Sequence, residues 1–401
     1  MIFAVALLPW LTVAGNPIIT TLSEMSRTLD LSESTAKLAF TMPNLTLIAT
    51  CLIGGAIVGR KISYRLHITI SALVMSISGT AIFFISDFTV ILIARGVFGL
   101  AMGFMTPVGS SLIFRLYTED KRARAIGVNT ASMYISTIAY TLIGGIFGLR
   151  GWHYVYLIHV LSLIPMVVLL RLLPDIPVIQ GSGEGAEATD KAEKRRTGFW
   201  QRFPPKCMFF IAFNFIFMLI TFPIQINVSF ILSELDIESA TTASVVLIIN
   251  TIAGAAAGIL FGYVTKAMRR FSLPFALALS CAGMFLASTA DGLNLLLAGS
   301  ALAGAGIAMI NIAVLLEVGY YVRKENIGLF SGINMAVCSF GAFCVSAYTG
   351  LLARMGFVSA QSPLMVSGVG VFALLVMFVV FIIFSNHLRK TGGTANAGAS
   401  D

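Results

Sequence analysis

Runs of about twenty apolar residues, the length that crosses a bilayer as a helix, recur along the whole chain. Backbone N–H and C=O groups in hydrocarbon must be paired internally, and the runs lack the alternating pattern of a membrane β-barrel. Each run is therefore expected to be a helix. The sequence predicts an all-α membrane protein with twelve transmembrane helices, at residues 2–22, 36–58, 66–86, 89–114, 125–148, 153–173, 206–229, 241–264, 272–290, 293–317, 327–352 and 363–385.

The composition supports a membrane protein and disfavours a soluble one. Of 401 residues, 57% are apolar and 11% are charged, whereas a soluble chain needs about a quarter of its residues charged. The net charge of +8 suggests no nucleic-acid partner, because the basic residues lie in alternate loops between the runs.

Signatures of enzymes and of bound metals are missing from the sequence. It contains no GxSxG, HExxH or P-loop motif. The five cysteines show no CxxC spacing, and the four histidines are widely scattered. We therefore expect no enzyme, no cofactor and no metal site.

The second half of the chain repeats elements of the first. Pro17, Asn44 and Arg60 recur 206 residues later as Pro223, Asn250 and Lys266, and Gly127-Val-Asn-Thr-Ala recurs 205 residues later as Gly332-Ile-Asn-Met-Ala. The matches fall at equivalent points of the hydropathy pattern. Two similar membrane halves around a shared site are typical of secondary transporters.

Lysine and arginine mark one side of the predicted membrane domain. The loops after the second, fourth, eighth and tenth runs are basic, which predicts that both termini are cytoplasmic. A polar, mixed-charge stretch at 174–204 follows the sixth run. The expected organisation is a six-helix bundle at 1–173, a cytoplasmic linker at 174–204, a second six-helix bundle at 205–390 and a disordered tail at 391–401.

Local motifs connect the chain to a known family. Arg95-Gly-Val-Phe-Gly99-Leu-Ala-Met-Gly103 resembles the fourth-helix motif of the major facilitator superfamily, and Gly151-Trp-His-Tyr resembles its entry into helix six. Within the superfamily the chain resembles bacterial multidrug-efflux members. The resemblance implies two pseudo-symmetric six-helix bundles in a bacterial inner membrane, alternating access of a small-molecule substrate, coupling to protons, and a monomer.

The resemblance also assigns gating residues, with departures. The loop after the second run reads Gly55-Ala-Ile-Val-Gly59-Arg60-Lys-Ile-Ser-Tyr-Arg65, and Gly59 stands where the family has an aspartate. Arg115 stands where the end of helix four is often acidic. The family's carboxylate–arginine latch is therefore in doubt, and Arg60 and Arg65 are expected to meet helix C-terminal carbonyls or lipid phosphates instead.

Arg95 is the most prominent candidate for substrate binding. It lies about 10 Å inside the fourth run at 1.5 Å per residue, where a charge normally faces a partner, water or substrate. The alternative is a structural arginine that ties helix four to helix one. The cavity-lining runs carry no carboxylate near their middle, which disfavours a strict organic-cation exchanger and leaves neutral, zwitterionic and anionic solutes open.

Several polar residues near mid-membrane are further cavity candidates. Each can instead form an interhelical hydrogen bond, and the repeat-related pairs Asn44/Asn250 and Asn129/Asn334 favour such a structural role. The candidates are Asn44, Tyr134, Tyr140, Asn214, Gln225, Asn227, Asn250, Asn311 and Asn334.

Other candidates concern proton transfer, bending and packing. His159 lies in the sixth run and titrates near neutral pH, although the resembling fold places that helix outside the cavity. Pro17 and Pro223 occupy equivalent positions and predict paired kinks in two cavity helices. Gly99 and Gly103 form a small-xxx-small step that predicts close helix packing.

These observations predict a secondary transporter. Proton-coupled efflux of amphipathic compounds is the first expectation, and proton-linked uptake of an organic anion anchored by Arg95 is the alternative. A non-transporting membrane receptor or scaffold is the alternative from a different class.

Overall fold

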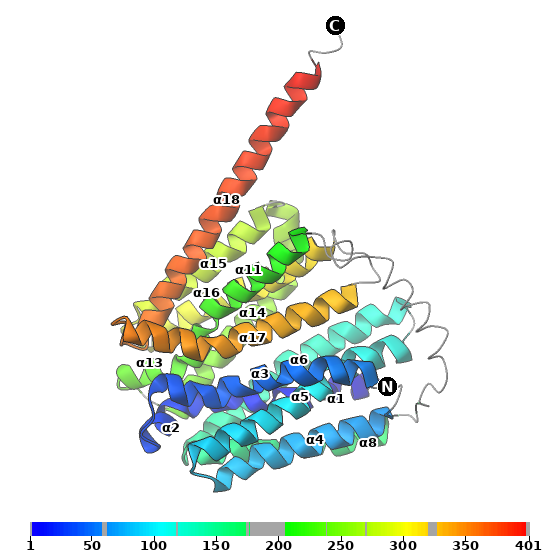
Figure 1. Ribbon diagram of the computed structural model, residues 1–401, viewed down its shortest axis with the longest axis vertical. Helices are drawn as coiled ribbons and strands as arrows, with labels where there is room; N and C mark the ends of the chain where they lie inside the picture. The colour runs from blue at the N-terminus through cyan, green and yellow to red at the C-terminus, as the bar shows by residue number, and fades with distance from the viewer. Residues whose placement is uncertain are drawn as a thin grey trace.

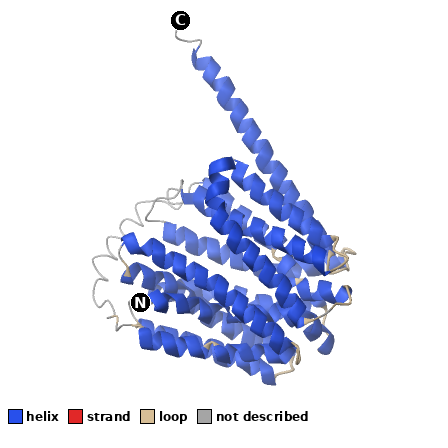
Figure 2. Ribbon diagram, turned by 180° about the vertical axis from the view of Figure 1, so that it is seen from behind, coloured by secondary structure: helices blue, strands red, loops and turns tan. Residues whose placement is uncertain are grey.

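The computed structural model describes residues 2–57, 62–117, 119–173, 176, 205–237, 239–268, 271–319 and 327–397. Its elements are helices (Figure 2). The first half contains α1 (Ile2–Thr12), η1 (Val13–Thr21), α2 (Leu22–Thr28), α3 (Glu33–Ile57), α4 (Tyr64–Ala81), η2 (Ile82–Phe84), α5 (Phe88–Leu116), α6 (Glu119–Gly148), η3 (Trp152–Leu157), α7 (Ile158–Leu161) and α8 (Leu163–Leu172). The second half contains α11 (Pro205–Thr221), α12 (Pro223–Ile226), α13 (Val228–Glu234), α14 (Ala240–Met268), α15 (Ser272–Ser288), α16 (Leu293–Gly319), α17 (Ile327–Arg354) and α18 (Ser362–Ala397).

The helices form the membrane fold that the sequence predicts. Within the described residues, 10 helical stretches are long and apolar enough to cross a membrane. The helices α3 and α15 occupy the two remaining positions in the predicted order of spans. The all-α membrane fold is therefore confirmed, and several boundaries move. The first span, for example, continues through α2 to Thr28 instead of ending at residue 22.

The two halves of the sequence form two neighbouring groups of helices (Figure 1). At their boundary α3 of the first half lies beside α17 of the second, and α6 packs against α14. Segments that are far apart in the sequence thus meet along the middle of the molecule. Any space between these helices is shared by both halves.

Equivalent residues of the repeat occupy equivalent places in the structure. Asp30 and Asp236 both have positive φ, at 51° and 56°. Asp30 follows α2 in the first half, and Asp236 follows α13 in the second. The Ser23 amide donates a hydrogen bond to Oγ of its own counterpart, Ser229, at 3.3 Å. An internal two-fold relation therefore passes between α2 and α13.

Both predicted proline kinks correspond to breaks in a helix. Pro17 lies in η1, a nine-residue 3₁₀ stretch between α1 and α2, although such stretches rarely exceed three or four residues. Pro223 begins the short helix α12, which separates α11 from α13. Because proline lacks an N–H, neither segment continues as a regular α-helix. The first and seventh spans are thus interrupted at the same repeat position.

The small-xxx-small step of α5 packs directly on α3. A Cβ atom added at Gly99 would overlap the backbone of Pro43, and one added at Gly103 would overlap the backbone of Leu47. The approach is close enough for the Thr50 hydroxyl to donate to the Leu100 carbonyl at 2.7 Å. Both glycines therefore lie where α5 and α3 approach closely, and their packing role stays a prediction.

We expect Gly103→Leu to destabilise the protein by about 1–3 kcal/mol, because the new side chain forces α5 away from α3. The measurement is the apparent Tm in detergent. Gly262→Leu is the matched control, since a Cβ at Gly262 in α14 meets no atom within 4 Å. Equal changes in Tm for the two variants would contradict the packing role.

The ends of the predicted bundles fall partly outside the described residues. Apart from Ile176, the predicted linker 174–204 lies outside them. The helix α18 continues to Ala397, past Lys390, where the sequence places the end of the ordered part. Residues 398–401 lie outside the described part of the chain.

Candidate functional site

A cavity of about 360 Å³ lies between the two halves. Its wall is formed by η1, α3 and α6 of the first half and by α11, α12, α14 and α17 of the second. The lining residues are Asn16, Ile19, Phe40, Asn44, Thr137, Thr141, Met218, Phe222, Gln225, Leu247, Asn250, Thr251, Met335, Cys338, Ser339 and Ala342. A second hollow is lined only by residues 291–295, which belong to the second half, so it does not lie between the halves.

Three of the predicted cavity residues line this space, namely Asn44, Gln225 and Asn250. The sequence analysis missed Asn16, together with hydroxyl groups of α6, α14 and α17. Asn16 directly precedes the helix-breaking Pro17, which is a signal that was available. Threonine and serine are common in membrane helices, where their hydroxyls often hydrogen-bond to other helices. Their positions in the sequence alone therefore did not indicate a cavity.

The cavity offers hydrogen bonds without charge. None of its described lining residues is acidic or basic. Nδ2 of Asn250 donates to the Ser300 carbonyl at 2.8 Å. The side chains of Asn16, Asn44 and Gln225 make no hydrogen bond within the described residues. Free carboxamides present both donors and acceptors to a bound molecule.

The remaining polar candidates lie away from the cavity. Nδ2 of Asn214 donates to Oδ1 of Asn334 at 2.8 Å, which ties α11 to α17 within the second half. Tyr140 is buried against Trp10, with ring centroids 5.6 Å apart. Tyr134, Asn227 and Asn311 are likewise absent from the described lining. For Asn214 and Asn334 the interhelical hydrogen bond was the correct alternative.

Arg95 points into the first half and does not line the cavity. It is only 1% exposed, and its Nε donates to the carbonyl of Ala39 in α3 at 2.6 Å. Its Cζ lies 4.8 Å from the ring centroid of Phe98. The prediction of a cavity arginine is therefore wrong for this structure.

The partner of Arg95 has a simple physical origin. In an α-helix the Ala39 carbonyl would accept from the amide of residue 43, but residue 43 is a proline inside α3 and has no N–H. A buried carbonyl without a donor is costly. Arg95 supplies the missing donor from the neighbouring helix, so it ties α5 to α3, where the sequence analysis expected a tie to helix one.

His159, the predicted proton carrier, is buried beside the same arginine. Its ring centroid lies 4.9 Å from that of Phe98, which also carries the Arg95 guanidinium on its face. Neither ring nitrogen of His159 has a hydrogen-bond partner within the described residues. His159 is 1% exposed and is not among the lining residues of the cavity, so its surroundings suit a packed side chain.

The predicted gate at the basic end is only partly described. Gly59 and Arg60 lie outside the described residues, and Gly55 lies in α3 near the end of the described range. Arg65 donates to the carbonyl of Leu173, the C-cap residue of α8, at 2.6 Å, as expected for an arginine that meets a helix C-terminus. The Arg115 guanidinium carbon lies 5.6 Å from the Tyr64 ring centroid.

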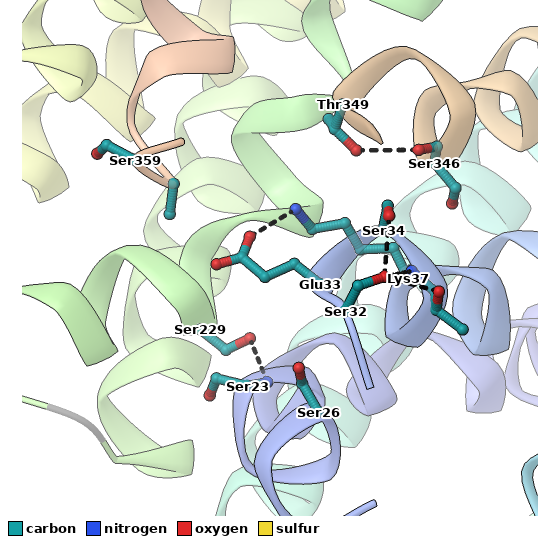
Figure 3. A network of polar contacts seen from close by, with 12 residues as sticks. Ser23, Ser26, Ser32, Glu33, Ser34, Lys37, Ser229, Ser346, Thr349 and Ser359 are labelled. Atoms are coloured by element: carbon teal, nitrogen blue, oxygen red, sulfur yellow. Dashed lines mark hydrogen bonds and ion pairs between the residues drawn. The ribbon is translucent and has the colours of Figure 1, made fainter. Parts of the chain in front are cut away.

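Away from the basic end, polar contacts join the two halves, and Figure 3 shows the one between Ser23 and Ser229 together with the nearby side chains of Lys37 and Ser346. We call this set of contacts the outer seal. Besides the Ser23–Ser229 hydrogen bond, the hydroxyls of Thr41 and Ser346 meet at 2.9 Å between α3 and α17. The Thr241 hydroxyl donates to the Gly145 carbonyl at 3.3 Å between α14 and α6.

Lys37 is a charged member of the outer seal that the sequence analysis missed. It is 2% exposed, and its Nζ lies 3.0 Å from Oε2 of Glu33, one turn earlier in α3. The same Nζ lies 4.7 Å from the ring centroid of Phe230, which belongs to the second half. The spacing of Glu33 and Lys37 was the available signal, because residues four apart meet on one helix face.

Comparison with known families gives a match over more than half of the chain. The model of the Major Facilitator Superfamily matches residues 2–235. No curated protein matches the sequence.

Solved structures with the same fold cover nearly the whole chain. A nucleoside transporter, NupG, is 15% identical with a TM-score of 0.74, covering 94% of this chain and 99% of its own. A D-xylose–proton symporter is 16% identical with a TM-score of 0.69, covering 94% and 96%. A bacterial homolog of the human lysosomal transporter Spinster, in an inward-facing and occupied conformation, is 15% identical with a TM-score of 0.71, covering 96% of both chains. At these identities the likeness establishes the fold.

Proposed function

The chain belongs to the Major Facilitator Superfamily, and on this premise we propose that it is a secondary active transporter that moves a small molecule by alternating access. The observation that carries the proposal is the cavity of about 360 Å³ between two pseudo-symmetric halves. The outer seal joins the two halves by hydrogen bonds. A cavity shared by two bundles that touch at one end is suited to rocking of one bundle against the other.

The orientation and organisation of the chain are part of the proposal. Because the loops after the second and eighth apolar runs are basic, we propose that the ends of α3 and α14 that precede them face the cytoplasmic side of a bacterial inner membrane. Both termini and the 174–204 linker are then cytoplasmic. The halves 1–173 and 205–390 act as the two moving bundles of a monomer. In this orientation the structure is closed toward the outside.

For the solute and direction, we propose efflux of a neutral amphipathic compound. The mixture of amide, hydroxyl and phenyl groups in the cavity supports an uncharged solute with one apolar face. Uptake of an organic anion is disfavoured, because Arg95, the residue expected to bind the anion, is not among the lining residues of the cavity. No specific feature of the described residues favours a receptor or scaffold.

We propose that the proton gradient drives transport, and that His159 is not the proton carrier. His159→Gln should therefore leave the dependence of flux on an imposed pH gradient unchanged, since the buried imidazole makes no hydrogen bond within the described residues and does not line the cavity. Gradient-dependent flux in the wild type that disappears in His159→Gln would contradict this assignment.

The test of the proposed function is solute flux in proteoliposomes, measured with and without a pH gradient for protein in both orientations. Gradient-driven accumulation of a neutral amphipathic solute is the expected result. Flux that ignores the gradient would indicate facilitated diffusion. Liposomes as tight as protein-free controls to neutral, cationic and anionic solutes alike would reject transport.

A further inference from the structure

The repeat places different chemistry at equivalent positions of the cavity wall. Asn16 of the first half corresponds, 206 residues later, to Phe222 of the second, and Ile19 corresponds to Gln225. Each pair contributes one carboxamide and one apolar group, and the halves contribute them in opposite order. By contrast, Asn44 and Asn250 are an identical pair. The cavity thus carries carboxamides from both halves, alongside apolar surface from both halves.

An aromatic surface completes this arrangement. The rings of Phe40 and Phe222, one from each half, stack with centroids 6.0 Å apart and an interplanar angle of 22°. Both residues line the cavity. Phenyl faces favour flat or ring-shaped apolar surfaces. The free carboxamides of Asn16, Asn44 and Gln225 complement a solute edge that carries both donors and acceptors.

We propose that the cavity selects uncharged solutes with one or two rings whose edges carry hydrogen-bond donors and acceptors, the chemistry shared by sugars and nucleosides. This inference rests on the proposed function and names the substrate class of its site. The volume of about 360 Å³ lies near the lower end of the range of ligand pockets, about 300–1,000 Å³, and therefore holds one such solute.

The lining disfavours both signs of charge on the solute. An anion finds no lysine, arginine or histidine among the described lining residues, and a cation finds no carboxylate there. The phenyl faces attract a cation weakly compared with the cost of removing it from water. Amides and hydroxyls replace the hydration of a neutral polar solute directly, so the uncharged member of any matched series is preferred.

Cys338 provides a reporter inside the cavity. It is one of the lining residues, and its thiol is free. Cys344, two turns further along α17, is also free and is not part of the described lining. A protein that retains only Cys338 therefore reports on solutes in the cavity, and a protein that retains only Cys344 is the matched control.

The test measures the rate at which a small neutral maleimide alkylates Cys338 in the purified full chain, with five probes added in turn. Glucose, glucosamine and glucuronate compare a neutral, a cationic and an anionic sugar, while uridine and uridine monophosphate compare a neutral and an anionic nucleoside compound. We expect glucose or uridine to slow alkylation about tenfold at ten times its Kd and the charged relatives to have no effect. Whichever neutral probe protects distinguishes a sugar site from a nucleoside site.

Three outcomes overturn the inference. The first is protection by a charged relative at or below the concentration of its neutral parent, and the second is the absence of protection by both neutral probes. Protection that is equal for Cys344 also overturns it, because a solute outside the cavity then explains the effect.

A variant reverses the expected selectivity. Gln225→Glu places a carboxylate in the lining, so glucosamine should now protect Cys338 better than glucose. Flux measurements keep the two proposals separate. Flux restricted to charged solutes supports transport and overturns the substrate class, whereas protection by neutral solutes without flux supports the class and contradicts transport.

Discussion

Pro43→Ala is expected to rescue most of the stability and transport that Arg95→Ala removes. Arg95→Ala takes the donor from the Ala39 carbonyl, which the structure pairs with Arg95 Nε at 2.6 Å, and empties the volume beside Phe98. A loss of at least about 2 kcal/mol is expected from the unpaired carbonyl and the cavity. An alanine at position 43 restores an amide N–H that reaches the Ala39 carbonyl within α3.

The measurement is a double-mutant cycle on apparent Tm, with proteoliposome flux as the second readout. In the Arg95→Ala background, Pro43→Ala should regain about 1–3 kcal/mol. In the wild-type background, Pro43→Ala should add no stability, since Arg95 already donates to the Ala39 carbonyl. A double variant that is stable but transports no better than Arg95→Ala would show that Arg95 acts in transport itself, and the structural interpretation would be wrong.

Lys37→Met is expected to stabilise the closed state of the outer seal, and Glu33→Gln is expected to destabilise it. Lys37 is buried at the contact between the halves, and exposure to water when the halves separate relieves its desolvation. Methionine has a similar length and no charge, and such replacements of buried ions often stabilise the packed state by about 1–4 kcal/mol. Glu33→Gln leaves the buried ammonium without its carboxylate and weakens the seal.

Labelling of Ser346→Cys with a membrane-impermeant maleimide from outside measures the two shifts. Ser346 meets Thr41 within the seal, so it is reached only when the seal opens. Lys37→Met should lower the labelling rate at least about tenfold, which corresponds to about 1.4 kcal/mol, and Glu33→Gln should raise it. Changes of the same sign in both variants would show that charge burial at Lys37 does not control the seal.

The sequence was sufficient to predict the fold because hydrophobic length and internal repetition act over whole helices. It predicted the breaks at Pro17 and Pro223 and the close approach at Gly99 and Gly103, since each depends on one residue's own chemistry. It also placed Asn44, Gln225 and Asn250 in the membrane interior, and the structure places them on the cavity wall.

The contacts of Arg95 and Lys37 could not be predicted from the sequence, because they depend on how each helix is rotated about its axis. Arg95 precedes Gly99 by four residues, so both lie on one face of α5, and Gly99 packs on α3. The spacing of the two residues therefore directs Arg95 to α3. The prediction of a cavity residue used only the depth of Arg95 within the predicted membrane helix. Lys37 escaped notice because a lysine near the start of an apolar run resembles an ordinary helix end. Its burial depends on Phe230, which is 193 residues away in the sequence.

The most direct test of alternating access is a reversible disulfide across the outer seal. In a protein without its native cysteines, Thr41→Cys and Ser346→Cys join α3 to α17 where the native hydroxyls lie 2.9 Å apart, close enough for a disulfide. Ser76→Cys with Ser162→Cys is the matched control, because those hydroxyls meet at 3.0 Å within the first half. Oxidation should abolish flux only in the Thr41/Ser346 pair, and reduction should restore it. Full flux through protein cross-linked between Thr41 and Ser346 would contradict opening of the outer seal in the transport cycle.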